Sequence, residues 1–424
     1  MQAPGEVFLT DISKEGREVT DYTVEDQGQA PRGVIELKRY GMEFHGRGGE
    51  YFKIWVVNIL LSVVTLYIYS AWAKVRTRRY FYGNTLLDKS AFGYHATGKQ
   101  LVLGRLIGLV LFVIVVMAES LGPRIVGVVY LLLLLLAPWA IWRSTLFNAR
   151  VSSYRNIRFG FNGGLGKFYW YLLVLPFLPL VLMAVCAGLL YVSGLLPTAD
   201  TLLFFIAVPV VAGFALMYLL APYVHCKLSQ FTVDHYRYGK ADFDTQLKPG
   251  RYYLITLKSL GILLFIWGLL LATGYVITLI DSSWLDVDSL FVKDGEPGLS
   301  FYLAMGIGYV VFLVTIYLAI AFYQARVRNY LFQRTLLAKE VQVDSSVGAR
   351  GLLWLTLSNT LLIVFTLGLG YPWAAVRKAR YFATNTSVWT AHSLTGFVAD
   401  QQRQVSAMGE EIGDALDMDL DIGI

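Results

Sequence analysis

Residues that could ligate a metal ion or act as nucleophiles are few and scattered along this chain. Five histidines and two cysteines occur in 424 residues, and only His225, Cys226 and His235 fall close together. A zinc site needs several such ligands converging on one point. Neither a G-x-S-x-G nucleophile motif nor a phosphate-binding glycine loop is present. We therefore predict no metal, no cofactor and no enzymatic activity.

The polar residues with the most informative spacing belong to a stretch that occurs twice. Asn58–Thr85 and Asn359–Thr386 align without a gap, and 15 of the 28 aligned residues are identical. Apolar composition alone could pair leucines, but it does not explain asparagine, tryptophan and arginine in the same register. Self-similarity of this kind indicates duplicated structural units.

Asn58 and Asn359 stand at the same position of the two units, inside an apolar run and 14 residues before Trp72 and Trp373. An amide in hydrocarbon needs a hydrogen-bond partner. That partner is either a neighbouring helix or a solute, because paired broken helices in two related halves are typical of transporter binding sites. The sequence leaves both interpretations open.

The arginines of the two units repeat on the helix face that carries the tryptophan. Aromatic and basic residues at a helix end usually anchor it at the membrane interface, yet such a face also suits anionic lipid headgroups or an anionic solute. The candidate solute- or lipid-binding residues are Asn58, Thr65, Arg76, Arg79 and Asn84, with their counterparts Asn359, Thr366, Arg377, Arg380 and Asn385. The candidate interface anchors are Trp72, Tyr80, Trp373 and Tyr381.

Composition indicates that membrane helices carry these residues. The chain is 56% hydrophobic and 16% charged, with a mean hydropathy of +0.54, whereas a soluble domain has about 25% charged residues. Apolar runs that approach or exceed about 20 residues are candidate spans. Six predicted full spans cover residues 101–118, 125–147, 168–193, 201–226, 252–280 and 301–325, and two further runs, 52–73 and 351–375, contain the duplicated units.

The basic residues set the predicted orientation. Of the 36 lysines and arginines, all except Arg124 and Lys293 lie in segments that the positive-inside rule assigns to the cytoplasm. Both termini are then cytoplasmic, and basic residues flank both ends of runs 52–73 and 351–375. We predict that these two runs are re-entrant helical hairpins, with ordinary spans as the alternative. The net charge of +6 therefore indicates topology, and we expect no nucleic-acid partner.

Short stretches of alternating polarity follow the helices, as in FGYHATGKQLV at 92–102. The alternation predicts six β-hairpins, including 34–44 and 385–398, which we expect to pair with one another because unpaired edges are usually avoided. The predicted fold is an all-α polytopic membrane protein with about six full transmembrane helices, two re-entrant or broken units and short cytoplasmic β-hairpins. It comprises a polar cytoplasmic tail (1–33), a single membrane domain (34–400) and an acidic C-terminal tail (401–424).

The run Y-S-A-W-A-K-V-R-x-R-R-Y-F-Y-G-N-T-x-L-D at 69–88, followed by F-x-Y-x-A-T-G at 92–98 and G-R-L at 104–106, resembles the YjgN-type family of bacterial inner-membrane proteins. The resemblance extends over roughly 40–400 and implies a multi-pass protein of the bacterial inner membrane. The family is known as a domain of unknown function, so no activity, substrate or catalytic residue is implied. This chain departs from the family at Tyr67, where members commonly have glycine.

From these features we predict that the protein binds or passes a small solute or lipid at the interface of the two duplicated units. We expect the units to pack around a pseudo-twofold axis normal to the membrane, with Asn58 and Asn359 facing a shared interior and the arginines around its cytoplasmic mouth. The alternative is a non-transporting scaffold that binds a protein partner through its cytoplasmic hairpins. The expected partners are membrane lipids, including anionic headgroups; the sequence predicts no particular oligomeric state.

Overall fold

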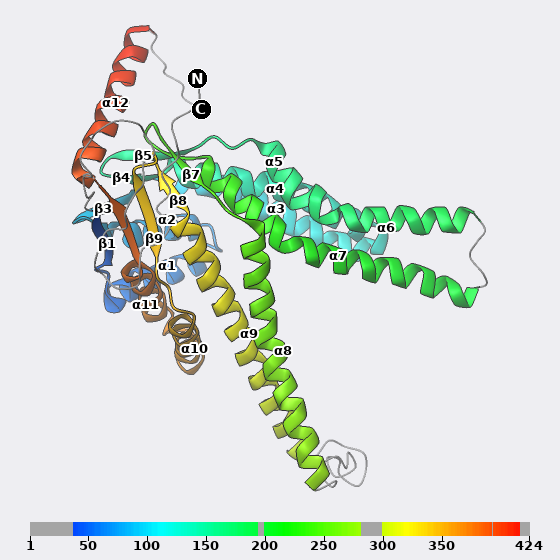
Figure 1. Ribbon diagram of the computed structural model, residues 1–424. Coiled ribbons are helices and arrows are strands. Elements are labelled where there is room, and N and C mark those ends of the chain that lie inside the picture. Colours follow the sequence, from blue (N-terminus) through cyan, green and yellow to red (C-terminus); the bar gives the residue numbers. More distant parts are fainter. Residues whose placement is uncertain (1–36, 194–198, 281–298, 392, 416–424) are drawn as a thin grey trace, which may run out of the picture.

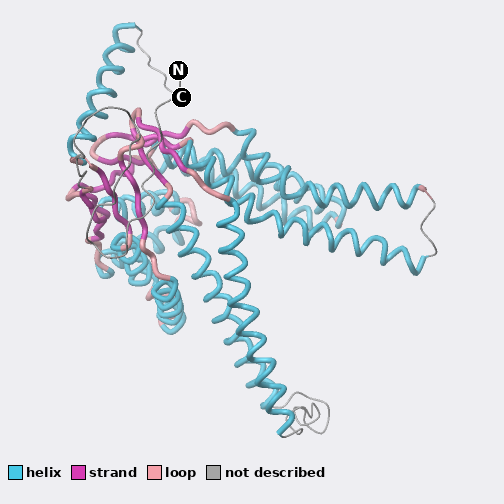
Figure 2. The backbone as a smooth tube through the Cα atoms, viewed as in Figure 1, coloured by secondary structure: helices cyan, strands magenta, loops and turns pink. Residues whose placement is uncertain are grey.

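The computed structural model describes residues 37–193, 199–280, 299–391 and 393–415, and it shows short strands gathered at one end of long helical hairpins (Figure 1, Figure 2). The strands are β1 (Lys38–Phe44), β2 (Thr85–Leu87), β3 (Ser90–Tyr94), β4 (Ser152–Tyr154), β5 (Ile157–Phe161), β6 (Tyr236–Tyr238), β7 (Ala241–Thr245), β8 (Thr335–Leu337), β9 (Val341–Ser345) and β10 (Thr386–Thr390). The helices are α1 (Gly48–Val64), α2 (Ser70–Gly83), α3 (Gly98–Leu121), α4 (Pro123–Arg150), α5 (Leu165–Tyr169), the π-helical turn η1 (Trp170–Val174), α6 (Leu175–Val192), α7 (Ala199–Asp234), α8 (Pro249–Ile280), α9 (Leu299–Gln333), α10 (Ala349–Phe365), α11 (Tyr371–Thr384) and α12 (Leu394–Ala415).

The strands form a closed antiparallel barrel, in the order β1-β10-β9-β8-β7-β6-β5-β4-β3-β2. Strands β2 and β3 are joined by Asp88 and Lys89, both with positive φ, as a two-residue hairpin turn requires. The pair that closes the barrel has no such turn, because β1 and β10 come from opposite ends of the membrane domain and pair from Lys38 with Thr390 onward. Closure leaves no free strand edge among the described strands.

The barrel corrects two details of the sequence prediction. Instead of a hairpin at 34–44, the described part of this segment is the single strand β1. Instead of a hairpin at 385–398, strand β10 is followed by helix α12. These two strands pair with each other across the length of the chain, which local alternation does not reveal. The all-α description is therefore incomplete, since a ten-stranded barrel accompanies the helices.

Apolar side chains fill the barrel, and α12 covers the end that lies away from the long helices (Figure 1). The Tyr154 hydroxyl donates a hydrogen bond to the Leu87 carbonyl at 2.7 Å, and burial raises the pKa of Tyr154 to about 12. The buried cluster consists of Leu87, Tyr154, Ile157, Tyr238, Ala241, Leu337, Val341 and Val388 from the barrel and Leu394, Phe397 and Val398 from α12. The barrel is thus a packed support for the helices.

By length and composition, the described part of the chain has six helices able to cross a membrane: α3, α4, the stretch from α5 into α6, α7, α8 and α9. At most 17% of their most apolar windows is buried within the protein, so a bilayer would cover the remaining apolar side chains. In Figure 1, α3, α4, α6 and α7 project together to the right, whereas α8 and α9 project downward. The six predicted spans are therefore present as apolar helices.

The duplicated stretches form two shorter helical hairpins, α1–α2 and α10–α11. The first helix of each has 17 residues, about 26 Å at the α-helical rise, which is less than the hydrocarbon thickness of about 30 Å. The chain then reverses through left-handed residues, Leu66 and Tyr67 in one unit and Leu367 and Gly368 in the other. Both hairpins return to the barrel, so each of the runs 52–73 and 351–375 reverses partway along its length.

Neighbouring hairpins contact one another head to tail around the barrel. The second helix of one hairpin packs against the first helix of the next, as in α2 with α3 and α7 with α8. Helix α11 packs against α1 and closes the ring. The duplicated units are therefore neighbours, but the predicted pseudo-twofold axis is wrong. A twofold axis pairs each surface with itself, whereas here α11 of one unit meets α1 of the other.

Candidate functional site

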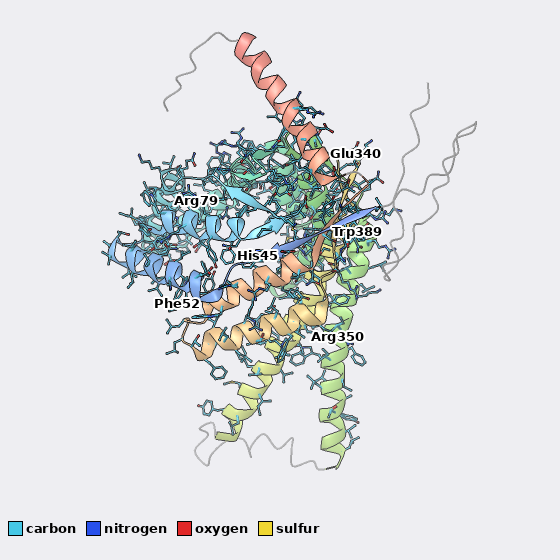
Figure 3. All side chains as sticks on the ribbon, turned by 90° about the vertical axis from the view of Figure 1, so that its left-hand side faces the viewer. His45, Phe52, Arg79, Glu340, Arg350 and Trp389 are labelled. Atoms are coloured by element: carbon cyan, nitrogen blue, oxygen red, sulfur yellow. The ribbon has the colours of Figure 1, made fainter. Side chains whose placement is uncertain are left out.

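A tryptophan and a glycine join each duplicated unit to the next hairpin in the ring. The Trp72 indole lies against Gly98, the first residue of α3, and the Trp373 indole lies against Gly48, the first residue of α1. A Cβ atom on either glycine would approach the indole to 2.3 or 2.4 Å. Phe52, on α1 (Figure 3), adds to the second joint, with its ring centroid 5.1 Å from that of Trp373. The predicted interface anchors thus also connect the hairpins.

Arg79 and Arg380 strengthen the same two joints. Nη2 of Arg79 donates to the carbonyl of Ala96 at 2.8 Å, and Nη2 of Arg380 donates to the carbonyl of Gly46 at 3.0 Å. Both acceptors lie in the turn between a strand and the next helical hairpin. At two further joints the corresponding donors are Asn329, which bonds to Val347, and Trp142, which bonds to Gly163. These arginines therefore hold neighbouring hairpins together.

Tyrosine and asparagine close the base of each unit. The hydroxyls of Tyr80 and Tyr381 donate to the carbonyl of the residue that precedes the first helix of their own unit, at 3.0 Å in both cases. Nδ2 of Asn84 donates to the Tyr80 carbonyl at 2.8 Å, and Nδ2 of Asn385 donates to the Tyr381 carbonyl at 2.7 Å. All four carbonyls also accept a backbone N–H, so these side-chain bonds add to the hydrogen bonds of the helix ends and tie the base of each unit together.

Asn58 and Asn359 connect the two helices of their own hairpin. Nδ2 of Asn58 donates to the Ala73 carbonyl at 3.3 Å, and Nδ2 of Asn359 donates to the Ala374 carbonyl at 3.1 Å. The side chains are 5% and 9% exposed, and the Oδ1 atom of each is buried without a hydrogen-bond partner within the described protein. Helix–helix bonding therefore accounts for the amide nitrogens but not for the amide oxygens.

Thr65 and Thr366 form the reversal of each hairpin. Their hydroxyls donate to the carbonyl four residues earlier, at 2.6 Å in both, and accept from the backbone N–H groups of Tyr69 at 2.9 Å and Gly370 at 2.7 Å. Each threonine is thus the C-cap of one helix and bonds to the residue that precedes the next helix. The polar side chain that the sequence analysis assigned to a solute is engaged by the backbone in both units.

Arg76 and Arg377 are the remaining predicted site residues, and they neither join neighbouring hairpins nor brace the helix ends and reversals of their own unit. Nη2 of Arg377 donates to Ser358 Oγ at 3.0 Å. Both guanidinium groups are exposed, and Arg76 makes neither a hydrogen bond nor an ion pair within the part of the chain that the structure describes. The predicted residues therefore divide between two equivalent structural frameworks, and no direct contact between described residues joins Asn58 to Asn359.

A cleft of about 730 Å³ opens beside the first unit, between α1, α2 and α3. Most of its lining is apolar, and Tyr371 of the second unit contributes to one wall, where its ring packs 6.2 Å from that of Trp55. The polar and charged residues that line the cleft, apart from its tyrosines, are Asn58, Ser62, Ser70, Lys74, Thr77 and Arg105. One predicted residue, Asn58, therefore reaches a cavity large enough for a ligand.

The charge of the cleft is positive and uncompensated. Among the residues that the structure describes, no aspartate or glutamate lines it, and no ion pair includes Lys74 or Arg105. The Arg105 guanidinium lies 5.3 Å from the centroid of the Tyr67 ring, and its Nη1 atom is buried without a hydrogen bond in the described structure. Lys74 lies close enough to the guanidinium groups of Arg78 and Arg105 for the charges to repel. An anion in the cleft would relieve that repulsion.

Comparison with known proteins places the chain in a family. Residues 39–415 match the family described as bacterial protein of unknown function (DUF898). The chain belongs to this family. Two relatives named inner membrane protein YjgN, from Salmonella typhimurium and Escherichia coli K12, are 26% and 24% identical over 360 and 363 residues. These alignments cover 81% and 83% of this chain and 87% and 89% of the relatives. No solved structure matches the chain.

The relatives and the six apolar helices identify this DUF898 protein as a multi-pass protein of the inner membrane. Sequence analysis missed Lys74 and Arg105, although both carried a signal. Arg105 is a charged residue inside the predicted span 101–118, and such residues often mark functional positions. Lys74 aligns with Ala375 in the second unit. Because the two units differ at this position, their identical residues do not mark it.

Proposed function

We propose that this DUF898 protein binds a membrane amphiphile in the cleft between α1, α2 and α3. The cleft itself carries the proposal: it has a volume of about 730 Å³, apolar walls, and the cations Lys74 and Arg105. Apolar walls suit an acyl chain, and interfacial cations suit a polar or anionic headgroup. The ligand would therefore lie beside the first duplicated unit, with Tyr371 as the contribution of the second.

Binding is proposed in preference to passage because the barrel offers no axial route. Its interior is filled by the cluster that includes Tyr154 and Tyr238, and Phe397 of α12 packs into the same cluster. A solute that moved along the helices toward the barrel axis would meet these side chains. An amphiphile that enters the cleft sideways from the bilayer avoids them.

We also propose that the barrel faces the cytoplasm. Every described hairpin leaves the barrel and returns to it, so the strands share one side of the membrane, and the positive-inside rule assigns that side to the cytoplasm. In a variant lacking Cys186 and Cys226, a cysteine at Lys89 should resist a membrane-impermeant maleimide added to spheroplasts, whereas one at Ser289 should react. Labelling of position 89 from outside would contradict the orientation.

Ser62→Phe tests the cleft, because Ser62 lines it and a phenyl ring would occupy its space. The matched control is Ile363→Phe, at the equivalent position of the second unit. Native mass spectrometry of protein extracted in mild detergent should show retained lipid in the wild type and in the control, and less in Ser62→Phe. Equal retention in all three proteins, or none in the wild type, would refute the proposal.

A scaffold that captures a protein partner through its hairpins is the weaker alternative. The hairpins are already paired with one another in the closed barrel, so the described strands provide no free edge for strand addition. A scaffold would have to use the outer surface of the barrel or α12. No observation on those surfaces favours a particular partner, and the cleft gives lipid binding the stronger support.

A further inference from the structure

Resting on the proposed function, we infer that the headgroup in the cleft is a phosphate diester with a hydroxyl donor, as in a glycerol-bearing anionic phospholipid. Lys74 and Arg105 bind the phosphate, and Oδ1 of Asn58 accepts a hydrogen bond from the hydroxyl. The juxtaposition of two cations with a buried amide oxygen around one cavity carries the inference.

An anionic ligand would stabilise the cations of the cleft. Lys74 is repelled by Arg78 and by Arg105, and the described residues of the cleft lining supply no carboxylate. The buried Nη1 of Arg105 still needs an acceptor, because an unpaired buried polar group is unfavourable. A phosphate oxygen can accept this hydrogen bond, and phosphate is one of the groups that match the guanidinium geometry of arginine. The stacking of Tyr67 over the guanidinium leaves its edge available for hydrogen bonding.

The amide oxygen of Asn58 needs a hydrogen-bond donor. Its Nδ2 atom is engaged by the Ala73 carbonyl, so turning the amide over would set two oxygens against each other. Oδ1 is therefore the atom left over, and it is buried without a partner. A phosphate cannot supply a donor when it is a fully ionised diester, whereas a headgroup hydroxyl can. A ligand that satisfies both Arg105 and Asn58 needs both groups.

The second unit shows that the amide oxygen alone does not make the site. Asn359 has the same bond and the same buried Oδ1 atom. The position of Lys74, however, is Ala375 there, and the position of Ser62 is Ile363. The second unit keeps a cation at the position of Thr77, Lys378, but it lacks the cation at the position of Lys74 and the hydroxyl at the position of Ser62. Asn359→Leu and Lys378→Gln, which removes a cation of the second unit, are therefore matched controls.

The experiment compares headgroups on the same acyl chains, using the full-length protein in detergent and native mass spectrometry of titrated lipid. Phosphatidylglycerol should bind about fivefold more tightly than phosphatidylmethanol, the anionic diester without a hydroxyl, for one neutral hydrogen bond. It should bind at least about tenfold more tightly than phosphatidylcholine, since charge-assisted bonds are stronger. Soluble glycerol 1-phosphate should bind far more weakly than phosphatidylglycerol.

The variants separate the two contacts. Asn58→Leu should bring phosphatidylglycerol down to the affinity of phosphatidylmethanol and leave phosphatidylmethanol unchanged. Lys74→Gln and Arg105→Gln should each weaken the binding of both anionic lipids by about tenfold without affecting the binding of phosphatidylcholine. Asn359→Leu and Lys378→Gln should rank the lipid headgroups by affinity in the same order as the wild type. Thermal unfolding of each variant without lipid shows whether it remains folded.

Failure of the inference and failure of the proposed function look different. If lipid is retained and Ser62→Phe displaces it, but the headgroups bind equally, the inference is wrong and the proposed function stands. If Ser62→Phe changes nothing, the proposed function is wrong and the inference falls with it. If glycerol 1-phosphate competes at the affinity of the lipid, the ligand is a soluble phosphate ester, which overturns the lipid assignment.

Discussion

The two duplicated units are built from the same framework, but they differ at most of the polar and charged positions that line the cleft of the first unit. Trp72 and Trp373 lie on equivalent glycines, and Arg79 and Arg380 bond to equivalent turns. The asparagine bonds between helices, the threonine caps and the tyrosine bonds at the base are also repeated. Many of the residues that are identical between the units therefore hold each hairpin together or join it to its neighbour in the ring.

The positions that differ include most of the polar wall of the cleft. Apart from Asn58, the polar and charged lining residues of the first unit, leaving its tyrosines aside, are replaced in the second: Ser62 by Ile363, Ser70 by Tyr371, Lys74 by Ala375 and Thr77 by Lys378. Position 105 has its counterpart in Trp55, counted from Gly98 and Gly48 at the helix starts. The framework residues and the cleft residues are therefore largely different sets. Substitutions in the framework should alter stability in both units, whereas substitutions in the cleft should alter lipid binding.

The largest effect is expected at the joints, and it should be the same in both units. In Gly98→Ala and Gly48→Ala the new methyl group would overlap the indole of Trp72 or Trp373. Each change should lower the free energy of unfolding by about 1–3 kcal/mol, as overpacking does. Thermal unfolding in mild detergent, followed by tryptophan fluorescence, measures the change.

Gly49→Ala is the control for these joints, because its new methyl group would have no neighbouring atom within 4 Å and alanine favours the helix. It should leave the unfolding temperature unchanged or raise it. If Gly48→Ala destabilised the protein and Gly98→Ala did not, the two joints would not be equivalent, and the common framework would fail as an explanation of the identical residues.

The sequence predicted the helices and the local strands, but it could not predict how the ends of the chain meet. The alternating stretches and the breaks at Thr65 and Thr366 are local patterns, so they were readable. The pairing of β1 with β10 joins Lys38 to Thr390, and no local pattern records it. The twofold axis was inferred from the two most similar units. The described ring contains three more hairpins, whose connections share the alternating pattern but whose helices do not share the identities of the two units.

The candidate site was predictable only at Asn58. Identity between the units drew attention to Asn58, Arg79 and Thr65, but identity reflects the shared framework as much as any site. The cleft depends on Arg105 of α3, which packs beside α2 only because the barrel sets neighbouring hairpins head to tail. That contact is a property of the ring.

A medium effect is expected at the paired asparagines, and here the units should differ once lipid is present. Asn58→Leu and Asn359→Leu each remove one amide-to-carbonyl bond, which should lower stability by about 0.5–1.5 kcal/mol in delipidated protein. Added phosphatidylglycerol should raise the unfolding temperature of Asn359→Leu as much as that of the wild type, since ligand binding stabilises the folded state. Asn58→Leu should gain less.

The comparison breaks if the two asparagine variants respond alike to lipid. An equal gain would mean that Asn58 has no ligand contact and that its amide only joins the helices, as in the second unit. An equal loss would mean that Asn359 also contacts lipid, so the shared asparagine and not the divergent cleft would define the site. Unfolding curves with phosphatidylcholine in place of phosphatidylglycerol separate headgroup binding from general lipid effects.

The smallest effect is expected at Arg76 and Arg377, which are identical between the units and exposed in both. Because neither belongs to a joint, Arg76→Gln and Arg377→Gln should change stability by less than about 0.5 kcal/mol. Each should weaken attraction to an anionic membrane surface by about 1 kcal/mol, an effect that salt screens. Native mass spectrometry should therefore show fewer weakly held phosphatidylglycerol molecules at low salt in both variants, with the tightest molecule unaffected. Loss of that tightest molecule in Arg76→Gln would instead make Arg76 part of the site with Lys74, and would extend the difference between the units to a residue they share.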